Sequence, residues 1–408
     1  MARRPKGTGS LRCMGEDRWQ VAVYVGGKRM TRVFTARNAT EANRAADAVR
    51  TALLADRKLV ANAEGVKREE RRKWTVEQYI AYYFREWAPD HLANTTRERY
   101  SQITKHQVIP HIGAKLMSEV TVNDLTKMYA ALAGKGSRRY SGTLAGQTIL
   151  TVHMVVRAVF AFACDVQKDF TENPARDKAA KPKIEQAVKK RGLDVAEVER
   201  FVTLAREQAP DIAVPVMLAA YLGTRRGETL ALRWCDMDFK GRELTVRRAV
   251  TQTPTYGVAV KTTKTGKQRI IPLDADTLAT LKTVQREQRE QRMALGKGWQ
   301  GAKAPADDYI ATTPTGAGIA PDAFANAFRT LAKQNKLTNV TPHILRHAWV
   351  SQMIALGFDA VTIAAMTGHS PDVLLRTYAH AFDGRKREAV DALGEARAAA
   401  RISARKTG

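Results

Sequence analysis

The first part of the chain alternates apolar and polar residues, as a half-exposed strand does. The run RWQVAVYVGGKRMTRVF has this alternation on both sides of a Gly-Gly pair at 26–27, which is typical of a hairpin turn. Apolar residues then recur every three or four positions in NATEANRAADAVRTALLA, which predicts a helix with Asn38 or Thr40 as its N-cap. Residues 1–63 are therefore expected to form a small sheet with one helix.

Helical spacing of apolar residues continues through residues 74–172 and predicts an all-helical domain there. Thr75, Thr95 and Thr121 each precede a helical stretch and are suitable N-caps. The charged stretch EGVKREERRKW before this domain predicts an exposed helix end or a linker. One aromatic stripe is expected to belong to the core rather than to a base-stacking surface: Tyr79, Tyr82, Tyr83 and Phe84.

The pattern changes twice more along the chain. Residues 173–192 combine prolines and many lysines with little periodic apolarity, which predicts a basic interdomain linker. In residues 193–395 helices alternate with three short antiparallel strands, RELTVRRAV, YGVAVKTT and KQRIIPL, and everything after Ala323 is expected to be helical. Residues 396–408 form a basic tail. The predicted fold class is mainly α with small antiparallel β-sheets (α+β) in three domains, the third of them mixed α/β.

Composition indicates the kind of partner. The chain has 408 residues, 44% of them hydrophobic, which is enough to bury cores in two or three domains. Lys and Arg total 67 against 41 Asp and Glu, a formal charge of +26 that attracts polyanions, of which nucleic acid is the commonest. A solvated basic surface with no such partner is the alternative.

Three sequence features bear on location. The cysteines are three and lie far apart, so they form no disulfide framework and fit a reducing cytosol. No apolar run reaches the ~20 residues that span a bilayer, and the basic N-terminus has no apolar segment behind it. We therefore expect a cytoplasmic protein that makes no membrane contact.

The stretch TPHILRHAWVSQM raises the question of a metal site. His343 and His347 are four residues apart, which places both rings on one helix face, as in zinc-dependent hydrolases. However, Arg346 lies beside them, and Ile344 stands where such hydrolases have a glutamate. A guanidinium repels a metal but binds phosphate oxygens in a fork, so this motif predicts an anion site and no metal. His347 is then expected to be a buried supporting group rather than a ligand.

Three further motifs carry candidate chemistry. In LGTRRGETLALRW, Arg225 or Arg226 interrupts apolar helices, and Glu228 is placed to pair with one of them. Lys264 lies in a predicted hairpin turn, where a lysine is either inert or able to deliver a proton. Tyr378 follows in TGHSPDVLLRTYAHAF. A free tyrosine ionises near pH 10, so it is a nucleophile only beside a neutralised phosphate and a proton acceptor, and otherwise it is a packing residue.

Five motifs in order, GTRRGE, KTGKQRIIPL, TPHILRH, TGHS and TYAH, resemble those of the tyrosine recombinase (phage integrase) family. The resemblance implies a role for each matching residue. Arg225, rather than Arg226, is the first catalytic arginine, and Lys264 is the general acid for the departing 5′ oxygen. His343 and Arg346 are the His-x-x-Arg pair, His369 hydrogen-bonds the scissile phosphate, and Tyr378 is the nucleophile that forms a 3′-phosphotyrosyl link. Thr224 and Thr367 stand where the family more often has an apolar residue.

The resemblance extends upstream. Residues 74–172 look like the helical core-binding (SAM-like) DNA-binding domain of such integrases, and residues 1–63 look like their small arm-type DNA-binding domain. Basic residues of these two regions and of the linker are candidate DNA contacts: Arg29, Arg32, Lys105, Lys181 and Lys183.

The family resemblance implies an enzyme that integrates or excises a mobile element without metal, ATP or any other cofactor. It implies double-stranded DNA as the partner, four protomers on two DNA sites, and room for a host DNA-bending protein and a directionality factor. The expected location is the bacterial cytoplasm, at the nucleoid. Two alternatives stay open: a topoisomerase or hairpin-forming resolvase of the same chemistry, and a DNA-binding protein that has lost catalysis.

Overall fold

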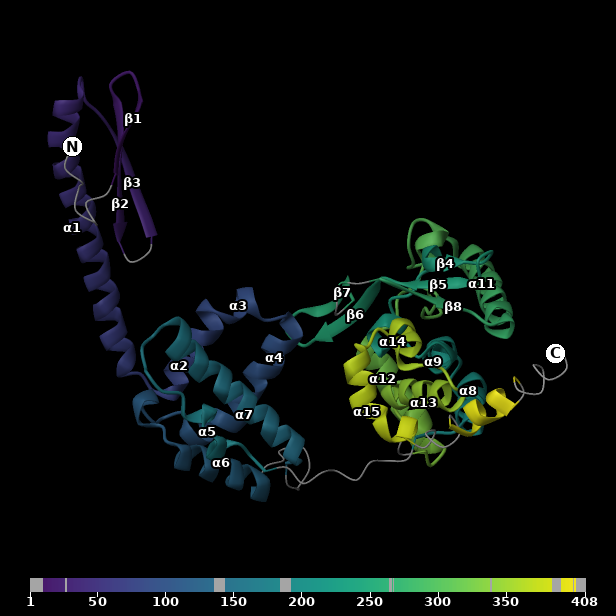
Figure 1. Ribbon diagram of the computed structural model, residues 1–408. Helices are drawn as coiled ribbons and strands as arrows, with labels where there is room; N and C mark the ends of the chain where they lie inside the picture. The colour runs from purple at the N-terminus through teal and green to yellow at the C-terminus, as the bar shows by residue number, and fades with distance from the viewer. Residues whose placement is uncertain are drawn as a thin grey trace. The chain divides into compact units, whose positions relative to one another are not determined.

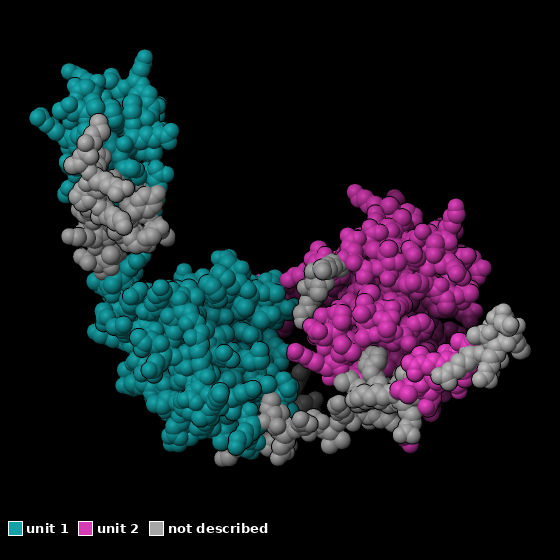
Figure 2. Space-filling model, viewed as in Figure 1, with its two compact units in different colours: residues 1–186 teal, residues 187–408 magenta. Residues whose placement is uncertain are grey.

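The computed structural model describes residues 10–25, 28–135, 144–183, 192–263, 266, 268–337, 340–383, 390–398 and 400. The chain divides into two compact units, residues 1–186 and 187–408, which Figure 2 colours separately. Each unit is mainly helical and carries small antiparallel sheets (Figure 1). The predicted class, mainly α with small antiparallel β-sheets, is therefore confirmed.

The described strands and helices of the first unit are β1 (Ser10–Gly15), β2 (Arg18–Val25), β3 (Lys28–Thr35), α1 (Ala39–Arg72), α2 (Val76–Glu86), α3 (Ala88–His91), α4 (Asn94–Ile103), α5 (Ile109–Ile112), α6 (Val122–Lys135) and α7 (Gly146–Ala161). Two π-helical turns, Thr104–Val108 and Phe162–Val166, join α4 to α5 and extend α7.

The N-terminal sheet has the order β1-β2-β3 with antiparallel neighbours, and the predicted hairpin strands are β2 and β3. The Gly-Gly pair between them lies outside the described residues. Val21 and Val23 of β2 pack against Ala46 and Leu53 of α1, so one face of the sheet is covered by this helix. Asn38 is confirmed as the N-cap, since its side chain accepts a hydrogen bond from the Glu41 backbone N–H at 2.9 Å.

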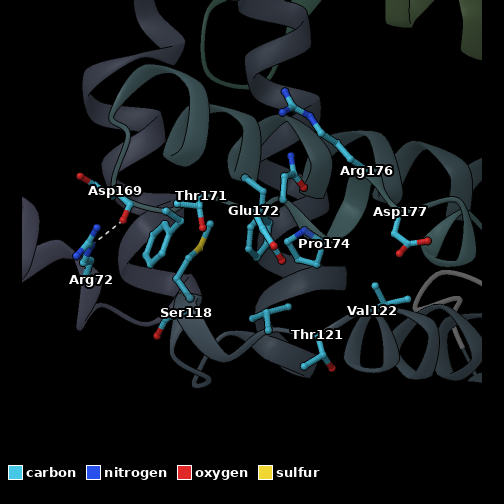
Figure 3. A pocket seen from close by; sticks show the side chains of 15 residues that line it. Arg72, Ser118, Thr121, Val122, Asp169, Thr171, Glu172, Pro174, Arg176 and Asp177 are labelled. Atoms are coloured by element: carbon cyan, nitrogen blue, oxygen red, sulfur yellow. Dashed lines mark hydrogen bonds between the residues drawn. The ribbon is translucent and has the colours of Figure 1, made fainter.

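Helix α1 continues without a break through the charged stretch from residue 64 and ends at Arg72, so that stretch is a helix end. Its last turn is held by Asp169, which is fully buried. Arg71 donates two hydrogen bonds to the two carboxylate oxygens, at 2.6 and 2.7 Å, and Arg72 donates from Nε to the Asp169 carbonyl at 2.8 Å (Figure 3). Tyr79 of α2 also donates to the carboxylate. Burial, with Asp169 adding to it, raises the pKa of Tyr79, which keeps this proton in place.

The helical part of this unit has an aromatic core. Tyr79 and Tyr83 are buried, as predicted, and Tyr82 and Phe84 pack against them. Thr75 caps α2 in a capping box with Gln78, which confirms that prediction. Thr121 also acts as predicted, because its hydroxyl accepts from the Asp124 backbone N–H at 3.3 Å.

The N-cap prediction for Thr95 was wrong. Helix α4 begins two residues earlier than that cap requires, at Asn94, with Ala93 in the cap position and no side-chain cap. Thr95 therefore lies inside the first turn, where its hydroxyl cannot serve as the N-cap. Propensity locates a helix but leaves its first residue uncertain by one or two positions.

One helix contradicts the prediction that no apolar run is long enough to span a bilayer. Among the described residues, the 21-residue helical stretch Gly146–Val166 passes that test by length and composition. Its apolar residues, including Val152, Val155 and Val159, are buried in the core of the first unit. The length and apolarity are thus those of a core helix.

Part of the segment expected to be a linker packs on this core. Ala175 and Ala180 are buried, and the Asn173 side chain donates to the Arg157 carbonyl at 3.1 Å. Residues 184–191 lie outside the described part of the chain. A groove of about 1040 Å³ runs beside this packed segment (Figure 3). None of the predicted catalytic residues that the structure describes lines it.

The described strands and helices of the second unit are α8 (Val195–Gln208), α9 (Pro210–Leu222), α10 (Arg226–Thr229), β4 (Met237–Asp238), β5 (Glu243–Val246), β6 (Arg248–Thr253), β7 (Gly257–Thr262), β8 (Arg269–Pro272), α11 (Ala275–Leu295), α12 (Pro321–Gln334), α13 (Pro342–Ala355), α14 (Ala360–Thr367) and α15 (Pro371–Asp383).

The three predicted strands become two sheets. RELTVRRAV is divided at Arg247: β5 pairs with β4 and β8, whereas β6 pairs with β7 in a separate hairpin (Figure 1). The buried carboxylate of Asp236 holds this change of partner, with Arg247 at 3.2 Å and Arg248 at 2.8 Å. Each half of the run has the same alternation, so the pattern did not reveal the break.

The core of this unit is helical. Phe201 of α8, Leu218 of α9, Phe324 and Phe328 of α12 and Leu345 of α13 are almost fully buried together. The prediction that the chain after Ala323 is helical is confirmed for its described residues, with α12 beginning two residues earlier. This core holds α9 and α13, and a smaller cluster that includes Ile363 and Ala364 holds α14; the candidate site lies at the ends of these helices.

Candidate active site

The site begins where α9 ends. Gly223 has φ +57, a left-handed conformation that glycine adopts without strain, and a Cβ there would lie 2.8 Å from the Trp349 ring. This sharp turn leads into Thr224, whose buried hydroxyl lies 2.7 Å from the Thr229 hydroxyl. The next residue, Arg225, is thereby aimed toward the end of α14.

The Arg225 side chain is fixed by Glu228 and by the Gly368 carbonyl group. Its Nη1 donates to Glu228 Oε1 at 2.9 Å, and its Nη2 donates to the Gly368 carbonyl at 2.8 Å. Its backbone N–H donates to Glu228 Oε2 at 3.0 Å. The predicted pairing of Glu228 with Arg225 is therefore present. Arg226 is exposed and donates to the Pro321 carbonyl at 3.4 Å.

A second arginine, Arg269 of β8, also binds the Glu228 carboxylate. Its Nη2 donates to Glu228 Oε2 at 2.5 Å and its Nε donates to the Met366 carbonyl at 2.8 Å. Glu228 is 2% exposed, so burial alone would raise its pKa. The hydrogen bonds and charges of Arg269 and Arg225 outweigh burial and lower the pKa of Glu228 instead.

Arg346 of α13 is 1% exposed, which is rare for an arginine. Its Nη1 donates to the Gly223 carbonyl at 2.8 Å and its Nη2 donates to the Thr367 carbonyl at 2.7 Å. Burial, together with the neighbouring charge of Arg225, lowers the pKa of Arg346. The C-terminal carbonyl groups of α14 offset this cost because they carry the negative end of the helix dipole.

His369 follows the left-handed Gly368 after α14, and Thr367 holds its ring. The Thr367 hydroxyl donates its one proton to the Ile363 carbonyl at 2.7 Å. The 3.0 Å contact between this oxygen and His369 Nδ1 must then have Nδ1–H as the donor. His369 Nε2 accepts from Arg346 Nη2 at 2.9 Å. Burial, with Arg346 and Arg225 adding to it, lowers the pKa of His369 to about 4, so the ring is neutral at pH 7.

Tyr378 comes from α15 and is 6% exposed. Its hydroxyl is hydrogen-bonded to His347 Nδ1. Burial raises the pKa of Tyr378 to about 12, and the charge of Arg346 acts in the opposite direction. The tyrosine is therefore protonated at rest and needs a proton acceptor to become a nucleophile.

The two histidines of the HILRH motif share a face of α13, as their spacing predicts. Their ring centroids are 4.5 Å apart in an edge-on arrangement, and His343 is exposed. Within the described residues, no group of three or more His, Cys, Asp or Glu side chains is arranged to hold a metal ion. His347, predicted to be a supporting group, directly contacts the candidate nucleophile.

The structure thus brings together Arg225, Glu228, Arg346, His369 and Tyr378, with His347 and His343 beside them. Lys264 lies outside the described residues. The candidate DNA contacts are all exposed and belong to the first unit: Arg29, Arg32, Lys105, Lys181 and Lys183.

Sequence reasoning missed two members of this cluster. Arg269 stands inside the quoted KTGKQRIIPL motif, but its partner carbonyl at Met366 is 97 positions away. Thr367 appeared only as a departure from the family pattern, although a buried threonine beside a histidine is itself a signal for a side-chain hydrogen bond. Both residues act through contacts that only the fold creates.

At the level of class, the fold and site define a protein with a cluster of cationic and hydrogen-bonding side chains suited to an anion, beside a buried tyrosine. Two arginines donate to the carbonyl groups at the end of α14, a neutral histidine accepts from one of them, and a buried tyrosine is close enough for Arg346 to influence its pKa. These groups neutralise anionic oxygens and supply a nucleophile.

Comparisons with known proteins agree with this class. Residues 191–385 match the phage integrase family model, and residues 75–133 match the model of the phage integrase N-terminal SAM-like domain. A tyrosine recombinase XerC-like protein of Caldanaerobacter subterraneus is 25% identical over 189 residues, which cover 44% of this chain and 48% of that protein. The ICEBs1 integrase of Bacillus subtilis is 27% identical over 205 residues, which cover 49% of this chain and 53% of that protein.

Among solved structures, the Tn1549 transposon integrase in complex with transposon right end DNA has a similar fold. Its TM-score is 0.64 at 20% identity, over 78% of this chain and 99% of that chain. The chain spans about half the length of the curated relatives described above. The chain belongs to the phage integrase family of tyrosine recombinases.

Proposed function

We propose that this protein is a site-specific DNA recombinase that cleaves and rejoins DNA through a 3′-phosphotyrosyl intermediate. The observation that carries the proposal is the convergence of Arg225, Arg346 and His369 on the end of α14, with Tyr378 beside them. Family membership and the names of the relatives support it.

The two arginines would hold the scissile phosphate. Each already donates to backbone carbonyl groups. Arg225 Nη2 and Arg346 Nη1 each use one hydrogen on a carbonyl and keep a second one for a phosphate oxygen. Glu228 keeps Arg225 in place, and Arg269 keeps Glu228 charged. Because these groups are fixed before the substrate arrives, they stabilise the charge that develops at phosphorus without having to reorganise.

Tyr378 would attack the phosphorus, and the 5′ oxygen of the broken strand would leave with a proton. Lys264 is the proposed donor of that proton, by the family resemblance. The resemblance also implies that His369 hydrogen-bonds the same phosphate, which would require its Nε2 to exchange Arg346 for a phosphate oxygen and to take up a proton. The energy of the phosphodiester stays in the tyrosyl ester, so a 5′ hydroxyl from a second DNA can reverse the step without ATP or metal.

The proposed biological outcome is integration or excision of a mobile element. The relatives support this, since they include the ICEBs1 integrase and a shufflon-specific DNA recombinase of Escherichia coli. The candidate DNA contacts Arg29, Arg32, Lys105, Lys181 and Lys183 would bind phosphates and set the position of the duplex. The protein would act on the nucleoid in a bacterial cytoplasm.

The proposed working unit is a tetramer on two duplexes, with a host DNA-bending protein and a directionality factor as further partners. A lambda integrase tetramer bound to a Holliday junction has a similar fold, with a TM-score of 0.53 at 15% identity. The exposed helical residues 390–398 after α15 are the segment we propose to dock on a neighbouring protomer.

Covalent trapping tests the proposed chemistry. Binding sites would first be selected from random-sequence duplexes, and nicked versions would be incubated with the full chain in EDTA. A protein–DNA adduct that survives denaturing electrophoresis with wild type, and not with Tyr378→Phe, is the expected result. Tight binding without an adduct on any selected or paired site would contradict the proposal and favour a DNA-binding protein without catalysis.

A further inference from the structure

We propose that His347 is the group that accepts the proton of Tyr378 when the tyrosine attacks DNA. This inference rests on the proposed function and assigns a catalytic role to a position for which neither the motif pattern nor the resemblance provides one. The geometry that carries it is the hydrogen bond between the Tyr378 hydroxyl and His347 Nδ1, supported by ring centroids 5.7 Å apart.

The other described histidines of the site are less well placed. His369 uses Nδ1 on the Thr367 hydroxyl and Nε2 on Arg346, so both nitrogens already have partners. His343 packs edge-on against His347 and is exposed at the surface of the site. Among these three rings, that of His347 is hydrogen-bonded to the phenol oxygen in the structure.

The charge state of His347 also suits a proton acceptor. Its ring faces His343 and Arg346 on its own helix, Tyr378 on α15, and His369 in the turn between α14 and α15. Burial, with these histidine and arginine neighbours adding to it, lowers the pKa of His347, so the ring is neutral at pH 7. A neutral imidazole with its Nδ1 lone pair on the hydroxyl can accept the proton directly.

The step balances as follows. The Tyr378 O–H bond breaks and its proton moves to His347 Nδ1, which becomes an imidazolium. The phenolate oxygen forms a bond to phosphorus, and the bond from phosphorus to the 5′ oxygen breaks. The departing oxygen takes up its own proton from a separate donor. On rejoining, the 5′ hydroxyl gives its proton back to the separate donor, its oxygen bonds to phosphorus, the bond from phosphorus to the tyrosine oxygen breaks, and the imidazolium returns its proton to the tyrosine.

The same hydrogen bond also fits a purely structural role, in which His347 only holds Tyr378 in its buried position; we call this role a latch. A general base and a latch predict opposite effects of substituting His347. His347→Asn places an amide near the position of Nδ1, so it can keep a hydrogen bond but cannot accept a proton. Removing a base slows the attack, whereas removing a latch leaves it unchanged or speeds it.

The experiment measures single-turnover adduct formation on DNA with a 5′-bridging phosphorothiolate at the cleavage point. Sulfur leaves without needing an acid, so the rate reports the attack of the tyrosine. For His347→Asn we expect a rate about 10²-fold below wild type at pH 7, the usual range for removing a general base, with unchanged DNA binding. The deficit should shrink toward pH 10, where hydroxide replaces the histidine.

A second variant keeps the test decisive. In His347→Ala, added imidazole should restore part of the lost rate, whereas in His347→Asn, whose amide occupies the position of the ring, added imidazole should have no effect. Adduct formation by His347→Asn at the wild-type rate or faster, with the wild-type pH profile, would overturn the proposal in favour of a latch. An absence of adduct with wild type as well would instead overturn the proposed function itself.

Discussion

At the scale of single residues, the protonation of the site depends on a threonine hydroxyl whose single proton is already donated to a backbone carbonyl. Thr367 donates to the Ile363 carbonyl, so its oxygen must accept from His369 Nδ1. This fixes the neutral tautomer whose Nε2 lone pair meets Arg346. An apolar residue at this position would pack equally well but would leave the tautomer free.

Replacing Thr367 tests this arrangement. In Thr367→Val the ring of His369 loses its Nδ1 partner, and we expect adduct formation to slow about tenfold, the lower end for loss of a supporting hydrogen bond. The affinity of this variant for DNA should stay within about a factor of two of the wild-type affinity, because Thr367 is buried. Thr367→Ser keeps the hydroxyl and should restore the rate. A serine variant as slow as the valine variant would show that packing, not the hydrogen bond, matters.

The sequence predicted individual residues where the partners are close along the chain. Glu228 was expected beside an arginine three positions away, and it is. Asn38 and Thr75 were expected to cap helices, and they do. The direct contact of His347 with Tyr378 spans 31 positions, and no local pattern encodes such a contact.

At the scale of elements, the four-residue helix α10 is too short to be stable by itself. Glu228 within it ties α10 to β8 through Arg269 and, through Arg225, to the end of α14. The element is therefore held by a buried ion-pair network rather than by helix propensity.

Glu228→Gln should reveal this dependence. The amide leaves two arginines with an uncompensated buried charge, so we expect a loss of about 3 kcal/mol in the free energy of unfolding, together with loss of cleavage. Chemical denaturation of the full chain measures the first effect. Glu290→Gln is the control, because its pair with Arg286 is largely exposed and should change stability by less than about 0.5 kcal/mol.

The end of α1 depends on a second buried carboxylate. Asp169 is fully buried under Arg71, Arg72 and Tyr79, so Asp169→Asn should cost about 3 kcal/mol and let the last turns of α1 open. Faster amide hydrogen exchange at residues 64–73 is the measurement. Asp165→Asn is the matched control because its pair with Arg176 is half exposed. Equal exchange rates in the two variants would contradict the anchoring role.

Element types were predictable, whereas element boundaries and partners were less so. Alternation identified the strands of both units, but not the change of partner at Arg247, which a buried aspartate imposes from outside the strand. The packing of residues 173–180 onto the helical core was also missed. Small residues such as Ala175 and Ala180 give no apolar periodicity, yet they allow close approach of the backbone.

At the scale of the whole molecule, several buried or partly buried groups make stability depend on pH in the same direction, and His369 and Glu228 are two of them. The folded-state pKa of His369 is about 4, below the ordinary 6.5, so between these values the unfolded chain binds more protons. Glu228 has a lowered pKa as well, and its contribution is present above its unfolded value and lost as the pH falls. Both therefore destabilise the fold in acid.

We expect the free energy of unfolding to fall by about 2 kcal/mol from pH 7 to pH 4.5, with His369 as the main source. Denaturant midpoints at several pH values measure this. His369→Gln should flatten the part of the curve between pH 6.5 and 4.5 and leave the steeper acid limb in place. An unchanged curve in that variant would assign the effect to other groups.

The net charge makes a further prediction about DNA binding. With a formal charge of +26, affinity should fall steeply with salt, with a log–log slope of about −0.9 for each phosphate neutralised. Replacing Lys105 or Lys181 by alanine should reduce the slope by about one if the residue contacts a phosphate. Equilibrium binding constants measured between about 50 and about 300 mM salt give this slope. A slope unchanged by either substitution would remove that lysine from the interface.

The uninterrupted course of α1 has a consequence for how this chain tolerates changes of length. The helix has 34 residues and is therefore about 50 Å long, with the sheet packed on its start and Asp169 bound to its end. Each added residue would turn the sheet by about 100° around the helix axis. One insertion therefore points the sheet in a different direction, whereas seven restore its facing to within about 20°. Tolerated insertions in α1 should follow the helical repeat rather than the number of residues added.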